Sequence, residues 1–157
     1  MAILVENKII EYIQTYSNKF LTFIMNLISG LFNASLFTVI ILFLYFYKKI
    51  TLEQILIIFI GTIILKIIKE TVQRERPYNS SKNIKLLDNN IIDRYSFPSG
   101  HSYYAFILSF ILEENTGFSL GFIPYLVAFS RMYLGVHYPT DVFGGYILAY
   151  ITSKFFS

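Results

Sequence analysis

Long apolar stretches separated by short polar segments dominate this chain and limit the folds open to it. Residues 34–47 contain no charged side chain, residues 52–68 contain few, and three more apolar stretches follow the polar segment 70–97. Hydrophobic residues make up 55% of the chain and charged residues 15%, with a mean hydropathy of +0.55. A soluble chain of 157 residues could not bury that much apolar surface in one core. The pattern therefore predicts an all-α, integral-membrane helical bundle.

The apolar stretches predict a single domain of about five or six helices over residues 1–157. The clearest helices are expected over residues 34–47, 52–68, 100–113, 118–133 and 139–156, within a helical core that covers residues 31–156. Successive helices joined by short loops run in opposite directions. The second helix should therefore end, the third begin, the fourth end and the fifth begin at the same membrane face. The polar residues at these four positions should converge there, and we expect an active site at that face.

The N-terminal part of the chain is less regular. Residues 1–20 carry several apolar side chains on one side of a helix, which predicts an amphipathic helix at the membrane surface or against the bundle. Asn26, Gly30 and Asn33 interrupt the next apolar segment and favour a kinked or re-entrant structure. The sequence has no basic region followed by an apolar core and a cleavage site, so we expect no removable signal peptide.

The residue types present exclude several kinds of site. The chain has no cysteine and only two histidines, His101 and His137. Disulfides, thiolate metal sites and a histidine-rich metal cluster are therefore excluded. We expect no metal site and no cofactor. The formal net charge of +3 is small, and no nucleic-acid partner is expected.

Three polar segments fall where the helix ends should meet. They are KETVQRERP over residues 69–77, PSGH over residues 98–101 and SRMYLGVHYPTD over residues 130–141. Three cations in these segments, Lys69, Arg76 and Arg131, could surround a phosphoryl group and neutralise the charge that develops during its transfer. Ser99 and Gly100 open a helix, where free backbone N–H groups form a site for an anion. The segments therefore indicate phosphate binding.

The two histidines and one aspartate supply the remaining chemistry. His137 and Asp141 are four residues apart at the start of a helix, so the carboxylate can reach the Nδ1–H of the imidazole. That contact would fix the tautomer and leave Nε2 free to attack phosphorus. His101 then has the role of general acid, which protonates the departing oxygen and later activates water. Arg74 and Glu75, inside the first segment, are interpreted as solvated loop charges.

These residues resemble the type 2 phosphatidic acid phosphatase family, part of the lipid phosphatase and vanadium haloperoxidase superfamily. Its three signatures, K-x6-RP, PSGH and SR-x5-H-x3-D, are present at every fixed position within residues 69–141. The resemblance implies that His137 is the nucleophile, His101 the acid–base and Asp141 the orienting group. It also implies that phosphate is bound by Lys69, Arg76, Ser99, Gly100 and Arg131. Members of the family commonly have one more full span at the N-terminus.

The expected function is hydrolysis of a phosphate monoester or pyrophosphate on a lipid, through a phosphohistidine intermediate. Phosphatidate, phosphatidylglycerophosphate, polyprenyl pyrophosphate and a phosphorylated lipid A all remain open as substrates. The alternatives are phosphate transfer to a hydroxyl acceptor, a non-catalytic lipid-binding or transport protein, and vanadate-dependent halide oxidation, whose enzymes are soluble. An ion pathway would place charges deep in the helices, whereas nearly all charges here fall at helix ends or in loops.

The expected location is the cell (inner or plasma) membrane, and the family resemblance implies an outward-facing active site. Lys48, Lys49 and Lys154 fall at the opposite end of the predicted bundle and favour that end as the cytoplasmic one. The expected partner is a lipid phosphate held in the bilayer, and the oligomeric state stays open.

Overall fold

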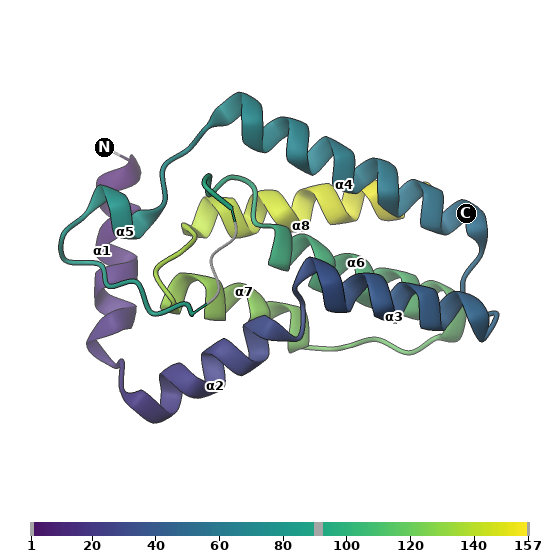
Figure 1. Cartoon of the computed structure of the whole chain (residues 1–157), viewed down its shortest axis with the longest axis horizontal. Helices are drawn as coiled ribbons and strands as arrows, with labels where there is room; N and C mark the ends of the chain where they lie inside the picture. Colours follow the sequence, from purple (N-terminus) through teal and green to yellow (C-terminus); the bar gives the residue numbers. More distant parts are fainter. Residues whose placement is uncertain (1, 90–92, 157) are drawn as a thin grey trace.

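The computed structural model describes residues 2–89 and 93–156, and within them it contains helices and loops but no strand (Figure 1). In chain order the helices are α1 (Ala2–Thr15), α2 (Lys19–Gly30), α3 (Ala34–Phe46), α4 (Leu52–Val72), α5 (Pro77–Ser80), α6 (Gly100–Thr116), α7 (Ile123–Tyr133) and α8 (Pro139–Ser153). The all-α prediction is confirmed. These residues form eight helices rather than five or six, because α2 and the one-turn α5 occupy segments that their polar residues suggested were irregular.

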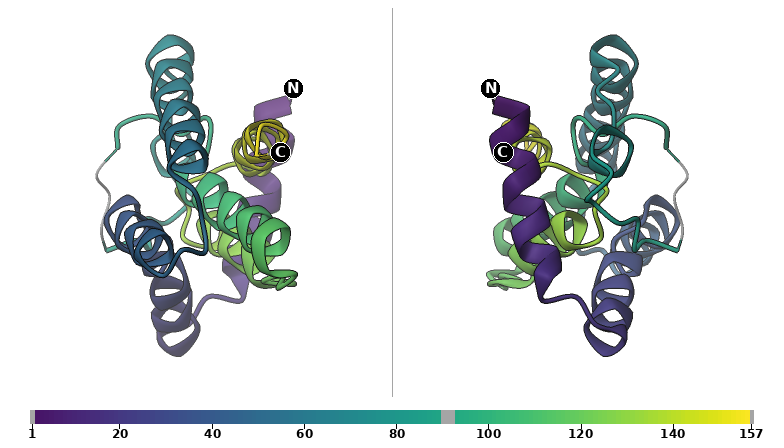
Figure 2. Two further views of the ribbon diagram at one scale, coloured as in Figure 1. Left: turned by 90° about the vertical axis from the view of Figure 1, so that its right-hand side faces the viewer. Right: turned by 90° about the vertical axis from the view of Figure 1, so that its left-hand side faces the viewer.

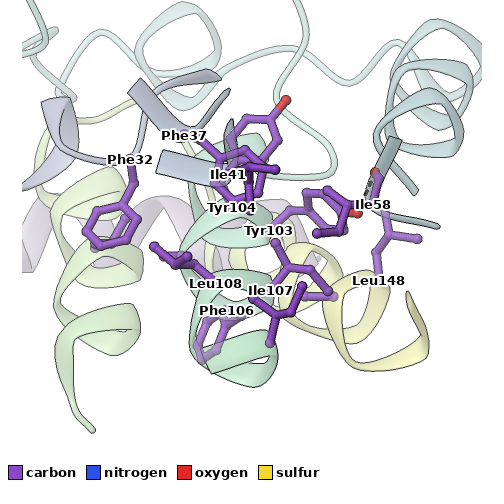
Figure 3. Close-up of a cluster of buried hydrophobic side chains, with 14 of the residues drawn as sticks. Phe32, Phe37, Ile41, Ile58, Tyr103, Tyr104, Phe106, Ile107, Leu108 and Leu148 are labelled. Atoms are coloured by element: carbon purple, nitrogen blue, oxygen red, sulfur yellow. Dashed lines mark hydrogen bonds between the residues drawn. The ribbon is translucent and has the colours of Figure 1, made fainter. Parts of the chain in front are cut away.

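Helix α6 forms the centre of the bundle. It packs against α8, α7 and α3, while α4 packs against α8 (Figure 1). Every residue from Ser102 to Ser109 is buried, so α6 has no solvent-facing side in its first half. Its apolar side chains meet Phe37, Ile58 and Leu148 of three neighbouring helices in one cluster (Figure 3). The buried first half of α6 thus combines apolar side chains with small hydroxyl-bearing ones and is covered by the surrounding helices.

Glycines allow the helices around α6 to approach it closely. A Cβ added to Gly145 of α8 would lie 2.5 Å from the backbone oxygen of Ser99 and 3.1 Å from the Cβ of Ser102. A Cβ added to Gly61 of α4 would overlap the hydroxyl group of Tyr103. Both contacts are closer than a real Cβ permits, so these two positions require glycine for the observed packing.

The turn between α6 and α7 lies further along the chain than the sequence predicts. α6 continues to Thr116 and ends at Gly117, which has a φ of 70°. The last two helical residues donate side-chain hydrogen bonds to carbonyl oxygens one turn earlier, which extends the helix through a polar sequence. α7 consequently begins at Ile123 and not at residue 118.

None of the helices within residues 2–89 and 93–156 has both the length and the hydropathy of a single membrane span. Only α2 and α3 together reach that length and hydropathy, and they meet at an angle of 47°. The kink predicted for this region is therefore present. Asn33 lies in the break and caps α3, because its side-chain oxygen accepts the N–H of Leu36 at 2.9 Å.

Helix α1 crosses one end of the bundle (Figures 1 and 2). Its buried residues are mainly polar and include Glu6, Asn7 and Gln14. Ile10 is also fully buried, whereas several other apolar side chains point outward, with Leu4 66% exposed and Tyr12 65% exposed. The side of α1 that faces the protein is therefore mainly polar, with Ile10 as its buried apolar contact, and much of its apolar surface faces outward.

The close approach of α6 and α8 can be tested by enlarging one glycine. Gly145→Ala is expected to lower the thermal unfolding temperature in detergent, because the new Cβ would meet a backbone oxygen. A cost of about 1–3 kcal/mol is typical when a packed contact is overfilled. Gly30→Ala is the matched control, since no atom lies within 4 Å of its added Cβ. Equal unfolding temperatures for the two variants would contradict the proposed packing limit.

Candidate active site

The three polar segments lie together at the end of the bundle that α1 crosses. Arg76 Nη1 lies 3.5 Å from His137 Nε2 and donates a hydrogen bond to the carbonyl of Val136 at 2.9 Å. The N–H of Ser99 donates to the backbone carbonyl of Asp141 at 2.9 Å. The segment 69–77 is thus bonded to the segment 130–141 through the Arg76 side chain. The segment 98–101 is bonded to the same segment through the backbone.

The three predicted cations are buried at this end. Lys69, Arg76 and Arg131 are only 5%, 3% and 3% exposed. Lys69 lies in the last turn of α4, where its Nζ donates to the carbonyl of Tyr95 at 2.9 Å and lies 3.3 Å from the Asp93 carboxylate. Arg76 Nε donates to the backbone carbonyl of Asp93 at 3.0 Å. The segment between α5 and α6 therefore supplies the acceptors that these buried charges need.

Arg131, near the C-terminal end of α7, has two partners that the sequence analysis does not include. Its Nη1 lies 2.9 Å from Asp88 Oδ2 and donates to the hydroxyl of Ser29 on α2. Its Nε is buried and has no hydrogen-bond partner in the part of the chain that the structure describes. This guanidinium is therefore held in place by two groups and retains a donor for an anion.

His137 lies between α7 and α8 and is 2% exposed. Its Nδ1 lies 3.6 Å from Asp141 Oδ2, and within the described residues this nitrogen forms no hydrogen bond. Asp141 Oδ2 instead accepts the backbone N–H of Tyr138 at 2.8 Å. The carboxylate thus lies beside the ring nitrogen that the spacing predicts, but without the expected hydrogen bond.

The surroundings of His137 favour its neutral form. Burial lowers the pKa of this imidazole well below its usual value, and the positive charges of Arg76, Arg131 and Lys69 lower it further. A neutral imidazole keeps a lone pair on one nitrogen. The lowered pKa therefore leaves His137 able to act as a nucleophile at neutral pH.

The start of α6 holds the second histidine and the predicted anion site. His101 lies in the electrostatic field of the three cations and of the other imidazole. Ser99 is the N-cap, and its Oγ accepts hydrogen bonds from the N–H and the hydroxyl of Ser102 at 3.4 and 3.0 Å. Because the Ser99 N–H already donates to Asp141, it is not one of the free donors that the sequence predicts. The first-turn N–H groups of Gly100 and His101 are the ones that remain for an anion.

Arg74 belongs to this site, although the sequence analysis treats it as a solvated loop charge. Its side chain is 17% exposed, and its Nη1 donates to Asp141 Oδ1 at 2.7 Å. Its Nη2 donates to Glu6 of α1 at 2.5 Å. Glu6, Asn7 and Gln14 share one side of the predicted N-terminal helix, and this polar side was the signal that α1 needs polar partners.

The described residues offer no group of three or more His, Cys, Asp or Glu side chains that could hold a metal ion. They do offer cationic side chains and a helix N-terminus beside two imidazoles. Such a site can bind a phosphoryl group and present a nitrogen nucleophile to it.

Comparisons with known proteins agree with this chemistry. Residues 50–157 match the sequence model of the PAP2 superfamily. The chain is 31% identical over 157 residues to phosphatidylglycerophosphatase B of Bacillus subtilis (strain 168), a match that covers 86% of this chain and 71% of that relative.

Two solved structures share the fold. Aquifex aeolicus LpxE gives a TM-score of 0.79 at 24% identity, covering 94% of this chain and 91% of that one, and this likeness concerns the fold alone. The first transmembrane PAP2 type phosphatidylglycerolphosphate phosphatase from Bacillus subtilis gives a TM-score of 0.72 at 27% identity. That match covers 96% of this chain and 83% of the solved chain.

The lowered pKa of His137 can be measured directly, because the chain has only two histidines. In a His101→Gln variant labelled with ¹⁵N-histidine, the remaining imidazole should titrate below the usual value of 6.5. The same variant unfolded in guanidinium chloride should titrate at about 6.5. As the pH falls, the folded ring should therefore stay neutral after the unfolded ring has become protonated. A folded midpoint equal to or above the unfolded one would contradict the assignment.

Proposed function

The chain belongs to the PAP2 superfamily, and we propose that it is a membrane lipid phosphatase that forms a phosphohistidine intermediate. The observation that supports this most is the position of His137 Nε2, 3.5 Å from the Arg76 guanidinium. Lys69 and Arg131 are buried in the same site. A cation next to the attacking nitrogen can hold a phosphoryl group in position and stabilise its charge during transfer.

The proposed reaction has two steps. In the first, Nε2 of His137 attacks phosphorus, and the bond between phosphorus and the leaving oxygen breaks. His101 donates a proton to that oxygen, so a monoester leaves as an alcohol and a pyrophosphate leaves as a lipid monophosphate. In the second, water attacks the phosphohistidine, His101 accepts a proton from the water, and inorganic phosphate is released. Asp141 orients the ring of His137 and stabilises the positive charge that forms on it.

Five residues are proposed to bind the phosphate. The cations Lys69, Arg76 and Arg131 neutralise its oxygens, and the free Nε of Arg131 is a donor already directed into a buried environment. Gly100 contributes its first-turn N–H, while Ser99 contributes through the hydroxyl that caps α6. In phosphoryl transfer such positioning and charge stabilisation supply most of the catalysis. We assign no metal or cofactor to the reaction.

The first substrate to test is phosphatidylglycerophosphate, because the relative that is 31% identical is named as a phosphatase of that lipid. Polyprenyl pyrophosphate, phosphatidate and a phosphorylated lipid A are the other candidates. In each of them the tail can stay in the bilayer while only the phosphate reaches the site. Transfer of phosphate to a hydroxyl acceptor is the second candidate function, since a phosphohistidine reacts with any suitable hydroxyl.

The surface of the bundle supports a position in the membrane for residues 1–157, which we propose to be one domain. Large apolar side chains are exposed on helices that contribute to the core on their other side. They include Phe20 and Phe23 of α2, Val39 and Phe43 of α3, and Leu56, Phe59 and Ile67 of α4. Such a surface is typical of contact with lipid. A similar solved structure is described as transmembrane.

The proposed function can be tested by phosphate release in detergent. The chain is expected to release phosphate from phosphatidylglycerophosphate, and His137→Ala should abolish release because no nucleophile remains. Asp141→Asn should reduce the rate by roughly 10⁴-fold, as when a triad carboxylate is neutralised. Lys49→Ala, at an exposed position remote from the motifs, is the matched control and should retain activity.

Labelled phosphate gives a second measurement in the same experiment. Protein quenched during turnover should carry alkali-stable, acid-labile phosphate, and His137→Ala should carry none. Release by His137→Ala at a rate near that of the unmodified chain would contradict the mechanism. Phosphate recovered on an added alcohol instead of in water would favour the transferase.

The proposed orientation places the site at the outer face of the cell membrane. Asn79→Cys and Asn89→Cys lie at exposed positions in the segment beside the site, and Thr116→Cys lies at an exposed position at the other end of α6. Because the chain has no cysteine, an impermeant thiol reagent reports each site alone. Intact cells should be labelled at the first two positions and not at the third. The opposite pattern would reverse the proposed orientation. Equal labelling of all three positions would contradict the proposal that the two ends of α6 lie on opposite sides of the membrane.

A further inference from the structure

Arg74 connects the carboxylate of the proposed catalytic pair to the rest of the protein. Its Nη1 donates to Asp141 Oδ1 at 2.7 Å and to the Thr140 hydroxyl at 2.6 Å. Its guanidinium carbon lies 4.0 Å above the centre of the Tyr138 ring. These contacts hold the guanidinium against Tyr138, Thr140 and Asp141, in the segment that follows His137 and begins α8.

Glu6 of α1 completes this arrangement from the other side. One carboxylate oxygen accepts from Arg74 Nη2 at 2.5 Å. The other accepts the N–H and the hydroxyl of Thr140 at 3.1 and 2.6 Å. Glu6 is 7% exposed, so its charge is balanced by protein groups and not by water. The N-terminal helix therefore contacts both Arg74 and Thr140, and Arg74 also contacts Thr140.

From α1 inward the charged side chains alternate in sign: Glu6 is negative, Arg74 is positive and Asp141 is negative. Asp141 uses Oδ1 for Arg74 and Oδ2 for the N–H of Tyr138, and Oδ2 also lies 3.6 Å from His137 Nδ1. Arg74 and the N–H of Tyr138 together therefore fix the distance between this carboxylate and the imidazole. Glu6 offsets the charge of Arg74, which leaves one net negative charge facing His137.

We propose that Glu6 and Arg74 are positioning residues for the Asp141–His137 pair, so that the N-terminal helix is a functional part of the active site. Arg74 fixes the carboxylate that orients His137, and Glu6 prevents Arg74 from cancelling the charge of that carboxylate. This inference rests on the proposed phosphatase function, in which His137 gains positive charge when it forms a bond to phosphorus.

The alternative is that the Glu6–Arg74 pair serves only to attach α1. Other contacts already do so: Glu11 accepts from the Ser81 hydroxyl at 2.9 Å, and Gln14 bonds the backbone of Lys85 in both directions at 2.8 Å. Glu11→Gln therefore removes a charge from the same helix, at a contact that does not reach Asp141. It is the matched control for Glu6→Gln.

The kinetic test compares the variants on the lipid that the unmodified chain hydrolyses. Glu6→Gln and Arg74→Gln should lower kcat by roughly 10- to 100-fold, by analogy with the loss when a hydrogen-bonding partner that orients a metal-ligating side chain is removed. KM should stay nearly constant, because neither side chain is proposed to touch phosphate. Arg74→Lys keeps the charge but not the two-sided contact, and it should recover part of the loss. Glu11→Gln should leave kcat unchanged.

The pH profile separates positioning from attachment. Arg74→Gln removes a positive charge near His137, which should raise the pKa of the imidazole and move the acid limb of kcat/KM to higher pH. Glu6→Gln removes a negative charge and should move that limb to lower pH. The other charged groups around the ring are the same in both variants: Asp141 on α8, Arg76 before α5, Arg131 on α7, Lys69 on α4 and His101 on α6. If the two substitutions only weakened the attachment of α1, they would not shift the acid limb of kcat/KM in opposite directions.

The His101→Gln background provides the same measurement without activity, because ¹⁵N-histidine then reports His137 alone. Opposite shifts of the His137 midpoint in Glu6→Gln and Arg74→Gln support the inference. If Glu6→Gln does not fold, Arg74→Lys with a lowered kcat and unchanged KM supports it. The inference would be overturned if the unmodified chain is active and the Glu6→Gln and Glu11→Gln variants have the same kcat and the same acid limb of kcat/KM. An inactive unmodified chain would instead contradict the proposed function, while the NMR shifts would still test the charge arrangement.

Discussion

The burial of three cations at one end of an apolar bundle is the constraint on which the rest of the structure depends. An ion removed from water is destabilising by several kcal/mol unless charged or polar partners replace the water. Lys69 obtains these partners from Asp93 and Tyr95, Arg76 from the carbonyls of Asp93 and Val136, and Arg131 from Asp88 and Ser29. The polar segment between α5 and α6 is therefore part of the site, because its carbonyl and carboxylate oxygens make the cation cluster possible.

The orientation of α1 follows from the same requirement. Asp141 is fully buried and needs a cation, which Arg74 supplies, and Arg74 in turn needs the carboxylate of Glu6. This succession of charges ends in a helix whose polar side faces the protein and whose Leu4 and Tyr12 face outward. Such a helix is stable where its outer side meets the lipid boundary. The electrostatics of the site and its proposed position at the membrane surface are thus consistent with one arrangement.

The sequence predicts the parts of the site that depend on helix starts and ends. Alternating helix directions bring Lys69, His101 and His137 to one end, and the four-residue spacing brings Asp141 beside His137. It does not predict partners that depend on loop conformation. The Arg74–Asp141 contact joins residues 67 apart, and no periodic pattern encodes such a pair. The kink after α2 was predicted, but the regular helix before it was not, because Asn26 suggested a break and instead forms bonds within and around the helix. Asn26, for example, donates to the carbonyl of Thr22 one turn earlier and to that of Leu87 in the loop.

The distance between the two proposed catalytic histidines is set by backbone packing. The N–H of Ser99 donates to the carbonyl of Asp141, which ties the start of α6, and with it His101, to the first turn of α8. Gly145, one turn further along α8, lets the carbonyl of Ser99 approach within van der Waals distance. Backbone groups have few alternative positions, whereas long side chains have many. The proposed reaction requires one histidine on each side of the transferred phosphoryl group, and joining the two motifs through the backbone holds this geometry firmly.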